Sequence, residues 1–177
     1  MSTELLVRRA QNGEKDAFLK LMKNNELAMY RAAKAILPTE EDVEDAVQET
    51  VCKAFAGLSG LRQPRYFKTW LTRILLNCCY DLLRQQRGEL PLELFCDSAQ
   101  PGGWSGGESD SALDIQALLS ALGPNDRLIL TLYYLNDLSV KEVSRLLSLS
   151  ESAVKKRLFR GRKRFQLLYE NTQDGEE

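Results

Sequence analysis

The residues with the clearest chemical potential are basic and lie near the C-terminal end of the sequence. Seven lysines and arginines fall within the ten positions from 155 to 164: Lys155, Lys156, Arg157, Arg160, Arg162, Lys163 and Arg164. Such side chains bind DNA phosphates, and a helix that presents them in a major groove also reaches base edges. A solvated surface helix is the alternative, but such helices usually place acids and bases four residues apart for mutual support. The single sign of charge therefore favours binding to nucleic acid.

A second set of residues with similar chemistry lies on a predicted helix from about Tyr66 to Gln86. Aromatic rings, cations and one amide recur at spacings of four and three residues, which places them on one helical face: Tyr66, Trp70, Arg73, Asn77, Tyr80, Arg84 and Arg87. The opposite face is apolar and is the predicted core: Phe67, Leu71, Ile74, Leu75, Cys78 and Leu82. Rings beside cations hold unpaired bases by stacking. The alternative is that Tyr66 and Trp70 pack against another helix, because large rings are costly to leave in water.

The distribution of charge separates these two basic regions. The whole chain of 177 residues has a net charge of −1 and a pI of about 5.7, so overall composition does not indicate a nucleic-acid partner. Residues 62–88 nevertheless hold six basic residues against one acid, whereas residues 89–115 hold six acids and no base. Residues 40–49 also hold six acids and no base. Two basic blocks divided by an acidic one predict two separate contact surfaces.

Several functional classes do not fit the sequence. The chain has no histidine, and its four cysteines form no CxxC pair, so neither a zinc site nor another metal is expected. Paired catalytic carboxylates and a glycine-rich phosphate loop are also missing, so we expect no enzyme activity and no cofactor. No stretch approaches eighteen unbroken apolar residues and the N-terminus lacks a signal-peptide core, which predicts a soluble, cytoplasmic protein without membrane insertion.

The C-terminal cations belong to a predicted pair of short helices. Ser139 and Glu142 have the spacing of a capping box, and Ser150 is a second N-cap signal. Apolar residues line a shared seam on the two helices: Val140, Val143, Leu147, Val154 and Leu158. Two short helices with a tight turn and a common apolar seam predict a helix-turn-helix, whose second helix carries the cations.

The rest of the chain also has helical periodicity, which predicts an all-α fold of two small domains. A first segment runs from about Glu4 to Leu37 with a break near Gly13, and Thr39 caps the next helix. Their predicted core residues are Phe18, Leu21, Met22, Tyr30 and Ile36, followed by Val43, Ala46, Val47, Val51, Ala54 and Phe55. The Gly- and Ser-rich segment 97–111 predicts a flexible linker. We expect domains at 1–88 and 112–172, a linker at 89–111 and a disordered tail at 173–177.

Two stretches resemble a known family. The sequence from Asp42, DVEDAVQETVCKAF followed by YFKTWLTRILLNCCYDLLRQQR, is similar to conserved region 2 of bacterial sigma factors. The sequence DLSVKEVSRLLSLSESAVKKRLFRGRKR, from Asp137, is similar to region 4 of the same family. With only these two regions and a short tether, the chain resembles the extracytoplasmic-function group, whose members direct core RNA polymerase to promoters.

The resemblance implies a role for each group of residues. The helix with Asp45, Val47, Gln48 and Glu49 would bind the clamp helices of the polymerase β′ subunit. The loop from Ser59 to Arg65 and the helix after it would recognise and melt the −10 element, through Arg62, Arg65, Tyr66, Lys68, Trp70, Arg73, Asn77 and Arg84. The −35 element would be bound as duplex by Ser150, Ser152, Lys155, Lys156, Phe159 and Arg160. Implied partners are the β flap of core polymerase, promoter DNA and an anti-sigma factor.

An alternative function from another class is a helix-turn-helix regulator that binds duplex DNA without polymerase. It would account for residues 139–164, but not for the aromatic and basic face from Tyr66 to Arg87 or the acidic helix at 40–49.

The chain also departs from the family pattern at three positions. Ser148 and Ser152 stand where the family usually has glycine, and Gly161 stands where it usually has alanine. We expect strain if Ser148 is left-handed, a helix weakened by about 1 kcal/mol at Gly161, and a role for Lys163 and Arg164 at the DNA backbone or the polymerase.

Overall fold

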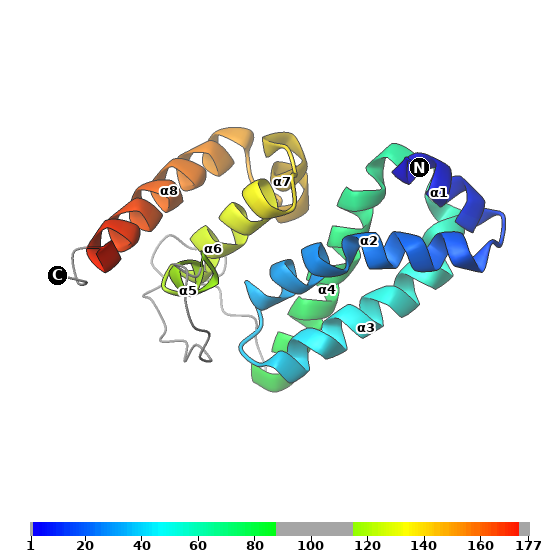
Figure 1. Cartoon of the computed structure of the whole chain (residues 1–177), viewed down its shortest axis with the longest axis horizontal. Helices are drawn as coiled ribbons and strands as arrows, with labels where there is room; N and C mark the ends of the chain where they lie inside the picture. The colour runs from blue at the N-terminus through cyan, green and yellow to red at the C-terminus, as the bar shows by residue number, and fades with distance from the viewer. Residues whose placement is uncertain (1, 88–114, 174–177) are drawn as a thin grey trace. The chain divides into compact units, whose positions relative to one another are not determined.

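The computed structural model describes residues 2–87 and 115–173, which form helices and turns (Figure 1). The predicted all-α fold is confirmed, because the described residues contain no strand. The chain divides into two compact units, Met1–Leu90 and Pro91–Glu177, and each is considered by itself. The predicted linker at 89–111 and the tail beyond residue 173 lie outside the described residues.

The first unit is a bundle of four α-helices. Its elements are α1 (Thr3–Gln11), α2 (Lys15–Lys34), α3 (Glu40–Gly57), two 3-10 turns, η1 (Leu58–Gly60) and η2 (Pro64–Tyr66), and α4 (Phe67–Arg87). The predicted break at Gly13 is confirmed, and this glycine adopts φ +90°, which other residues rarely do. The predicted cap is confirmed as well, since Thr39 Oγ1 accepts a hydrogen bond from Asp42 N at 3.1 Å.

The core of this unit lies among all four helices. Phe18, Leu21 and Met22 are buried as predicted. Tyr30 and Ile36 are only half-buried, and the Tyr30 hydroxyl donates to Glu40 Oε2 at 2.6 Å instead of entering the core. The prediction for Phe55 was wrong: its side chain is 62% exposed, and its ring meets Phe18 edge-on at the rim. The other predicted core positions that prove half-buried are Val47, Val51, Ile74 and Leu82.

The second unit contains the helix-turn-helix. Its elements are α5 (Ile115–Ser120), α6 (Pro124–Leu130), the π-helical turn η4 (Thr131–Leu135), α7 (Val140–Leu147) and α8 (Glu151–Gln173). α6 and α7 both pack on α8. Gly123 and Pro124 stand at the N-cap and first position of α6, where proline's fixed φ suits a helix start.

Both predicted caps of the helix-turn-helix are confirmed. Ser139 N donates to Glu142 Oε2 at 2.9 Å and Glu142 N donates to Ser139 Oγ at 3.3 Å, which completes the capping box. Ser150 Oγ accepts from Ala153 N at 3.1 Å at the start of α8. The seam between the two helices is closed by four buried residues: Val143, Leu147, Val154 and Leu158. These contacts fix the start of α8, where the cations lie.

The turn between α7 and α8 contains the expected strain. Ser148 adopts φ 54° and ψ 38°, the left-handed conformation in which a side chain is disfavoured. We therefore expect Ser148→Gly to raise the free energy of unfolding by about 0.5–1 kcal/mol in urea denaturation of the full chain. The matched control is Ser152→Gly, inside α8, which should lower it by several tenths of a kcal/mol. Equal destabilisation by both changes would contradict a strained turn at Ser148.

Candidate polymerase and nucleic-acid interfaces

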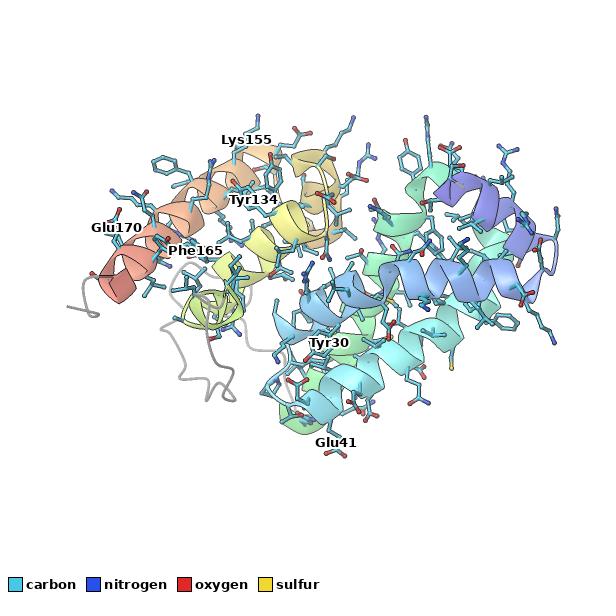
Figure 2. The ribbon with its side chains drawn as sticks, viewed as in Figure 1. Tyr30, Glu41, Tyr134, Lys155, Phe165 and Glu170 are labelled. Carbon is cyan, nitrogen blue, oxygen red and sulfur yellow. The ribbon has the colours of Figure 1, made fainter. Side chains whose placement is uncertain are left out.

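The outer surface of α3 is acidic. Glu41, Glu44 and Asp45 are exposed, and for these three the described residues show no ion pair. In Figure 2 the Glu41 side chain projects away from the ribbon of α3. Gln48 and Glu49 continue this exposed surface one turn further on, whereas Val47 is half-buried. α3 thus presents a strip of one charge sign.

Two acids of this region are engaged within the protein. Glu40 contacts Lys34 and accepts from the Tyr30 hydroxyl, and the hydrogen bond from Lys34 holds the pKa of the Glu40 carboxyl below its ordinary value. Buried Asp42 accepts from Gln86 Nε2 at 2.6 Å, which ties the start of α3 to the end of α4. These two residues fix the corner of the bundle, so the acidic surface available to a partner starts at Glu41.

A groove of about 430 Å³ runs between α3 and α4. Asp45, Gln48 and Glu49 line it, so the structure brings together three of the four predicted polymerase-binding residues. Lys53, which sequence reasoning missed, lies in the same groove with its Nζ 3.4 Å from Glu49 Oε1 and 3.7 Å from Cys78 Sγ. The other lining residues are Ala46, Cys52, Cys78, Asp81, Leu82 and Gln85.

Part of the predicted nucleic-acid face along α4 is exposed to solvent. Arg73, Asn77 and Arg84 are exposed on the side of α4 opposite the core, and Tyr66, at the end of η2 directly before this helix, is exposed as well. The Tyr66 ring is 40% exposed, and the Arg65 guanidinium lies 4.7 Å from its centroid. An open ring beside a cation has the chemistry needed to stack on a base near a phosphate.

Trp70 and Tyr80 are less exposed to solvent than their positions on the predicted nucleic-acid face suggested. Trp70 is half-buried, with its ring centroid 5.9 Å from that of Phe67 and its edge against Gly57. Tyr80 is half-buried too, and burial raises the pKa of its hydroxyl to about 12. The alternative of packing against another helix therefore describes part of the Trp70 ring, which lies against Gly57 of α3, and does not describe the exposed Tyr66 ring.

The remaining −10 candidates lie in different settings. Arg62 is exposed in the loop before α4, and this loop is held by Gln11, whose Nε2 donates to the carbonyl oxygens of Leu58 and Leu61 at 3.0 and 2.8 Å. Lys68 is exposed, but its spacing puts it on the side of Thr72 and Leu75, away from Tyr66. Arg84 pairs with Asp81 at 3.0 Å, and the Arg87 side chain lies outside the description.

The exposed side of α8 collects most of the −35 candidates. Ser152, Lys155, Lys156 and Phe159 are all exposed, and Phe159 is 66% exposed. Figure 2 shows Lys155 projecting outward from α8. Ser150 Oγ lies 3.2 Å from Ser152 Oγ at the helix start. The N-terminal half of α8 therefore has the polar and cationic outer surface that a groove-binding helix requires.

Arg160 and Arg164 lie elsewhere, at the crossing of α8 with α6. Arg160 Nη2 is 3.4 Å from Asp126 Oδ1, and Arg164 Nη1 is 2.6 Å from Asp126 Oδ2. The Asp126 side chain is only 2% exposed. Arg164 thus forms an internal ion pair that the sequence did not predict, and its expected role at the DNA backbone or the polymerase stays a prediction. Sequence reasoning missed Asp126, because nothing in the local pattern links α6 to α8.

Gly161 lies at the same crossing. A Cβ at this position would lie 3.3 Å from Leu130 Cγ and Cδ1, tighter than most contacts of real Cβ atoms. The glycine therefore allows α6 and α8 to approach closely. This close packing is a second effect of Gly161, beside the lower helix propensity expected from the sequence.

Leu130 also lines an apolar pocket of about 300 Å³ in the second unit. It is lined from α5, α6, η4 and α8 by Ile115, Leu119, Leu130, Tyr134, Leu135, Arg162 and Phe165. Ile115 and Tyr134 at this pocket are 55% and 47% exposed. The sequence indicated no such site, because its lining residues come from four separate segments.

Two negative observations apply to the described ranges 2–87 and 115–173. Within them, no three His, Cys, Asp or Glu side chains are grouped so as to hold a metal ion. No helix there has the length and apolar character needed to cross a membrane.

Comparison with known proteins assigns the family. Residues 16–89 match the family model of sigma-70 region 2, and residues 112–165 match sigma-70 region 4. The chain is 30% identical over 178 residues to the RNA polymerase sigma factor CnrH of Cupriavidus metallidurans, an alignment that covers 93% of this chain and 92% of the relative. It is 31% identical over 182 residues to the RNA polymerase sigma factor NccH of Alcaligenes xylosoxydans xylosoxydans, over 96% of each.

A solved structure shows the same fold. CnrH, in a complex with the cytosolic domain of CnrY, superposes with a TM-score of 0.66 at 24% identity, over 96% of this chain and 97% of that one. The chain belongs to the sigma-70 family of RNA polymerase sigma factors, in the extracytoplasmic-function group. As such it binds core RNA polymerase and promoter DNA and directs the initiation of transcription.

Proposed function

We propose that the two units divide the work of promoter recognition. The first unit binds core polymerase through the acidic strip and groove of α3 and holds the unpaired −10 strand on α4. The second unit binds the −35 element as duplex through the N-terminal half of α8. The proposed boundaries remain 1–88 and 112–172. The observation that carries this proposal is the exposed Tyr66 ring just before α4, which the Arg65 guanidinium approaches to 4.7 Å, because a ring beside a cation suits stacking on an unpaired base.

Three residue sets follow from the geometry. For polymerase binding we propose Asp45, Gln48 and Glu49 around the half-buried Val47. For the −10 strand we propose Arg62, Arg65, Tyr66, Arg73, Asn77 and Arg84. Trp70 contributes the exposed part of its ring, and Lys68 reaches DNA only from the side of the helix. For the −35 duplex we propose Ser150, Ser152, Lys155, Lys156 and Phe159, with Arg160 at the edge of this surface.

Further partners and the location belong to the same proposal. The apolar pocket between α5, η4 and α8 is a suitable site for a short apolar segment of the polymerase β flap. CnrH is solved with the cytosolic domain of CnrY, and a sigma factor RpoE is solved with the anti-sigma factor NepR from Bartonella quintana. We propose that an anti-sigma factor likewise restrains this chain, and that the protein acts in the cytoplasm without enzyme activity of its own.

Direct association with core polymerase distinguishes this proposal from a helix-turn-helix regulator that acts without polymerase. The full chain should be retained by immobilised core polymerase in the absence of DNA, and the resulting complex should produce run-off transcripts from its promoters. A regulator would bind promoter duplex alone and would not be retained by core polymerase. The acidic strip and groove of α3 favour the sigma function, because duplex binding has no use for them.

We expect Tyr66→Ala to weaken binding of holoenzyme to a single-stranded −10 oligonucleotide by roughly tenfold, because base stacking contributes about 1–3 kcal/mol per ring. Fluorescence anisotropy with a labelled oligonucleotide measures the change. Tyr66→Phe keeps the ring and should retain most of the affinity. Unchanged affinity for Tyr66→Ala would exclude this ring as a stacking platform.

Trp70→Ala should also lower thermal stability, because part of that ring packs on Phe67 and Gly57.

A further inference from the structure

Asp126 connects α6 to the DNA-binding helix, although it lies outside the helix-turn-helix itself. Its two carboxylate oxygens face different arginines: Oδ1 faces Arg160 at 3.4 Å and Oδ2 faces Arg164 at 2.6 Å. The carboxylate is 2% exposed, whereas the two arginine side chains remain 31% and 52% exposed. A single buried acid thus holds two cations that still reach the surface.

The two arginines occupy one edge of α8. They are four residues apart and therefore lie on the same side of the helix. The side that enters the core carries Val154, Leu158 and Gly161, and the outer side carries Lys155, Lys156 and Phe159. When a helix lies in a major groove, its outer side meets base edges while its edges face the phosphate backbones. Contacts to phosphates fix the register and orientation of a protein on the duplex.

The ion pairs between Asp126 and the two arginines are expected to be stable. Burial removes a carboxylate from water, and without a nearby cation that loss of solvation would not be offset. The two arginines therefore stabilise the charged form of Asp126 strongly. Gly161 lies beside Asp126 at this crossing, because a Cβ at Gly161 would meet Asp126 Cβ at 3.5 Å, an ordinary contact distance. Each guanidinium has five N–H donors, and part of each side chain remains exposed while Arg160 Nη2 and Arg164 Nη1 donate to Asp126. The same groups can therefore be held by Asp126 and present N–H donors to a phosphate.

We propose that Asp126 is a positioning residue for promoter recognition. It holds Arg160 and Arg164 at the edge of α8, where they contact phosphates of one strand and fix the register in which Lys155 and Lys156 meet the bases. On this account Arg160 contributes to specificity by alignment, and base edges are contacted by the residues of the outer side. This inference rests on the proposed binding of α8 to the −35 duplex.

The test is a competition assay with holoenzyme assembled from core polymerase and the full chain. Holoenzyme binds a promoter with the preferred −35 element in competition with promoters that carry single-base changes in that element, over a series of salt concentrations. We expect Asp126→Asn to reduce the preference for the correct element by roughly tenfold, because the guanidiniums lose their fixed orientation. The matched control is Glu170→Gln, which removes the same charge from an exposed position of α8 and should leave the preference unchanged.

A second variant covers the case in which Asp126→Asn does not fold. Arg160→Gln leaves Asp126 paired with Arg164 and should reduce the preference in the same direction. Where Asp126→Asn does fold, adding it to Arg160→Gln should change the preference by less than it does in the wild-type background. This dependence would not arise if Asp126 only stabilised the fold.

The outcomes separate this inference from the function on which it rests. An unchanged preference in a folded Asp126→Asn holoenzyme would overturn the inference. An equal loss of affinity for the correct and altered elements would also overturn it, because Asp126 would then be only structural. Failure of Lys155→Ala with Lys156→Ala to affect the −35 element would instead refute the proposed function of α8.

Discussion

The double change Asp45→Arg with Gln48→Ala is expected to abolish binding to core polymerase while leaving the fold intact. Both side chains are exposed and line the groove between α3 and α4, so their contribution to folding should be within about 0.5 kcal/mol. Reversal of a charge inside an interface costs several kcal/mol, so the dissociation constant should rise roughly 100-fold or more. Titration of labelled chain with core polymerase measures this, and thermal unfolding checks the fold.

The control for this experiment makes the same chemical changes on another helix. Glu26→Arg with Asn24→Ala alters two exposed residues of α2 and should leave polymerase binding unchanged. If Asp45→Arg with Gln48→Ala bound core polymerase as tightly as the control, α3 would not be the main contact. Loss of binding in both variants would show that charge alone, and not the groove, governs association.

Removal of the two outward lysines of α8 is expected to have the second large effect. Lys155→Ala with Lys156→Ala should lower holoenzyme affinity for promoters that depend on the −35 element, because each contact to a base edge contributes about 1–3 kcal/mol. Any of these contacts that is made to phosphate should also lower the slope of log affinity against log salt by about one unit. Run-off transcription at several salt concentrations measures both effects.

The matched control changes two exposed lysines of α2. Lys20→Ala with Lys23→Ala removes the same charge from the first unit and should leave −35 dependence intact. Transcription that stayed dependent on the −35 element without Lys155 and Lys156 would mean that α8 binds DNA by another side. An equal effect of both pairs would indicate general electrostatic attraction.

The sequence predicted the features that depend on local chemistry. Caps at Thr39, Ser139 and Ser150 follow from side chains that satisfy backbone donors within the same turn, so three or four neighbouring residues contain the required information. The strain at Ser148 was expected from the resemblance instead, because the family usually has glycine there and a left-handed serine is disfavoured. Helical periodicity also predicted the buried seam of the helix-turn-helix, because residues that share a face recur at a fixed spacing.

The features that the sequence did not predict depend on contacts between distant segments. Asp126 pairs with residues 34 and 38 positions later, and no periodic pattern links such positions. The apolar pocket combines four segments in the same way. Phe55 appeared to be core because it continues an apolar stripe, yet α3 has turned it to the rim of the bundle by its last turn. Tyr80 followed the spacing of the nucleic-acid face, but the packing of the bundle leaves it half-buried.

The division of work between the units is tested most directly by transcription from two forms of one promoter, a complete duplex and a template whose −10 region is already unpaired. Holoenzymes with Tyr66→Ala or with Lys155→Ala and Lys156→Ala are compared with wild type on both. We expect the unpaired template to restore much of the activity lost by Tyr66→Ala, because stacking on the ring no longer has to drive the separation of the strands. We expect it to restore none of the −35-dependent activity lost by the lysine variant. Equal restoration of both variants, or of neither, would contradict the assignment of single-strand binding to α4 and duplex binding to α8.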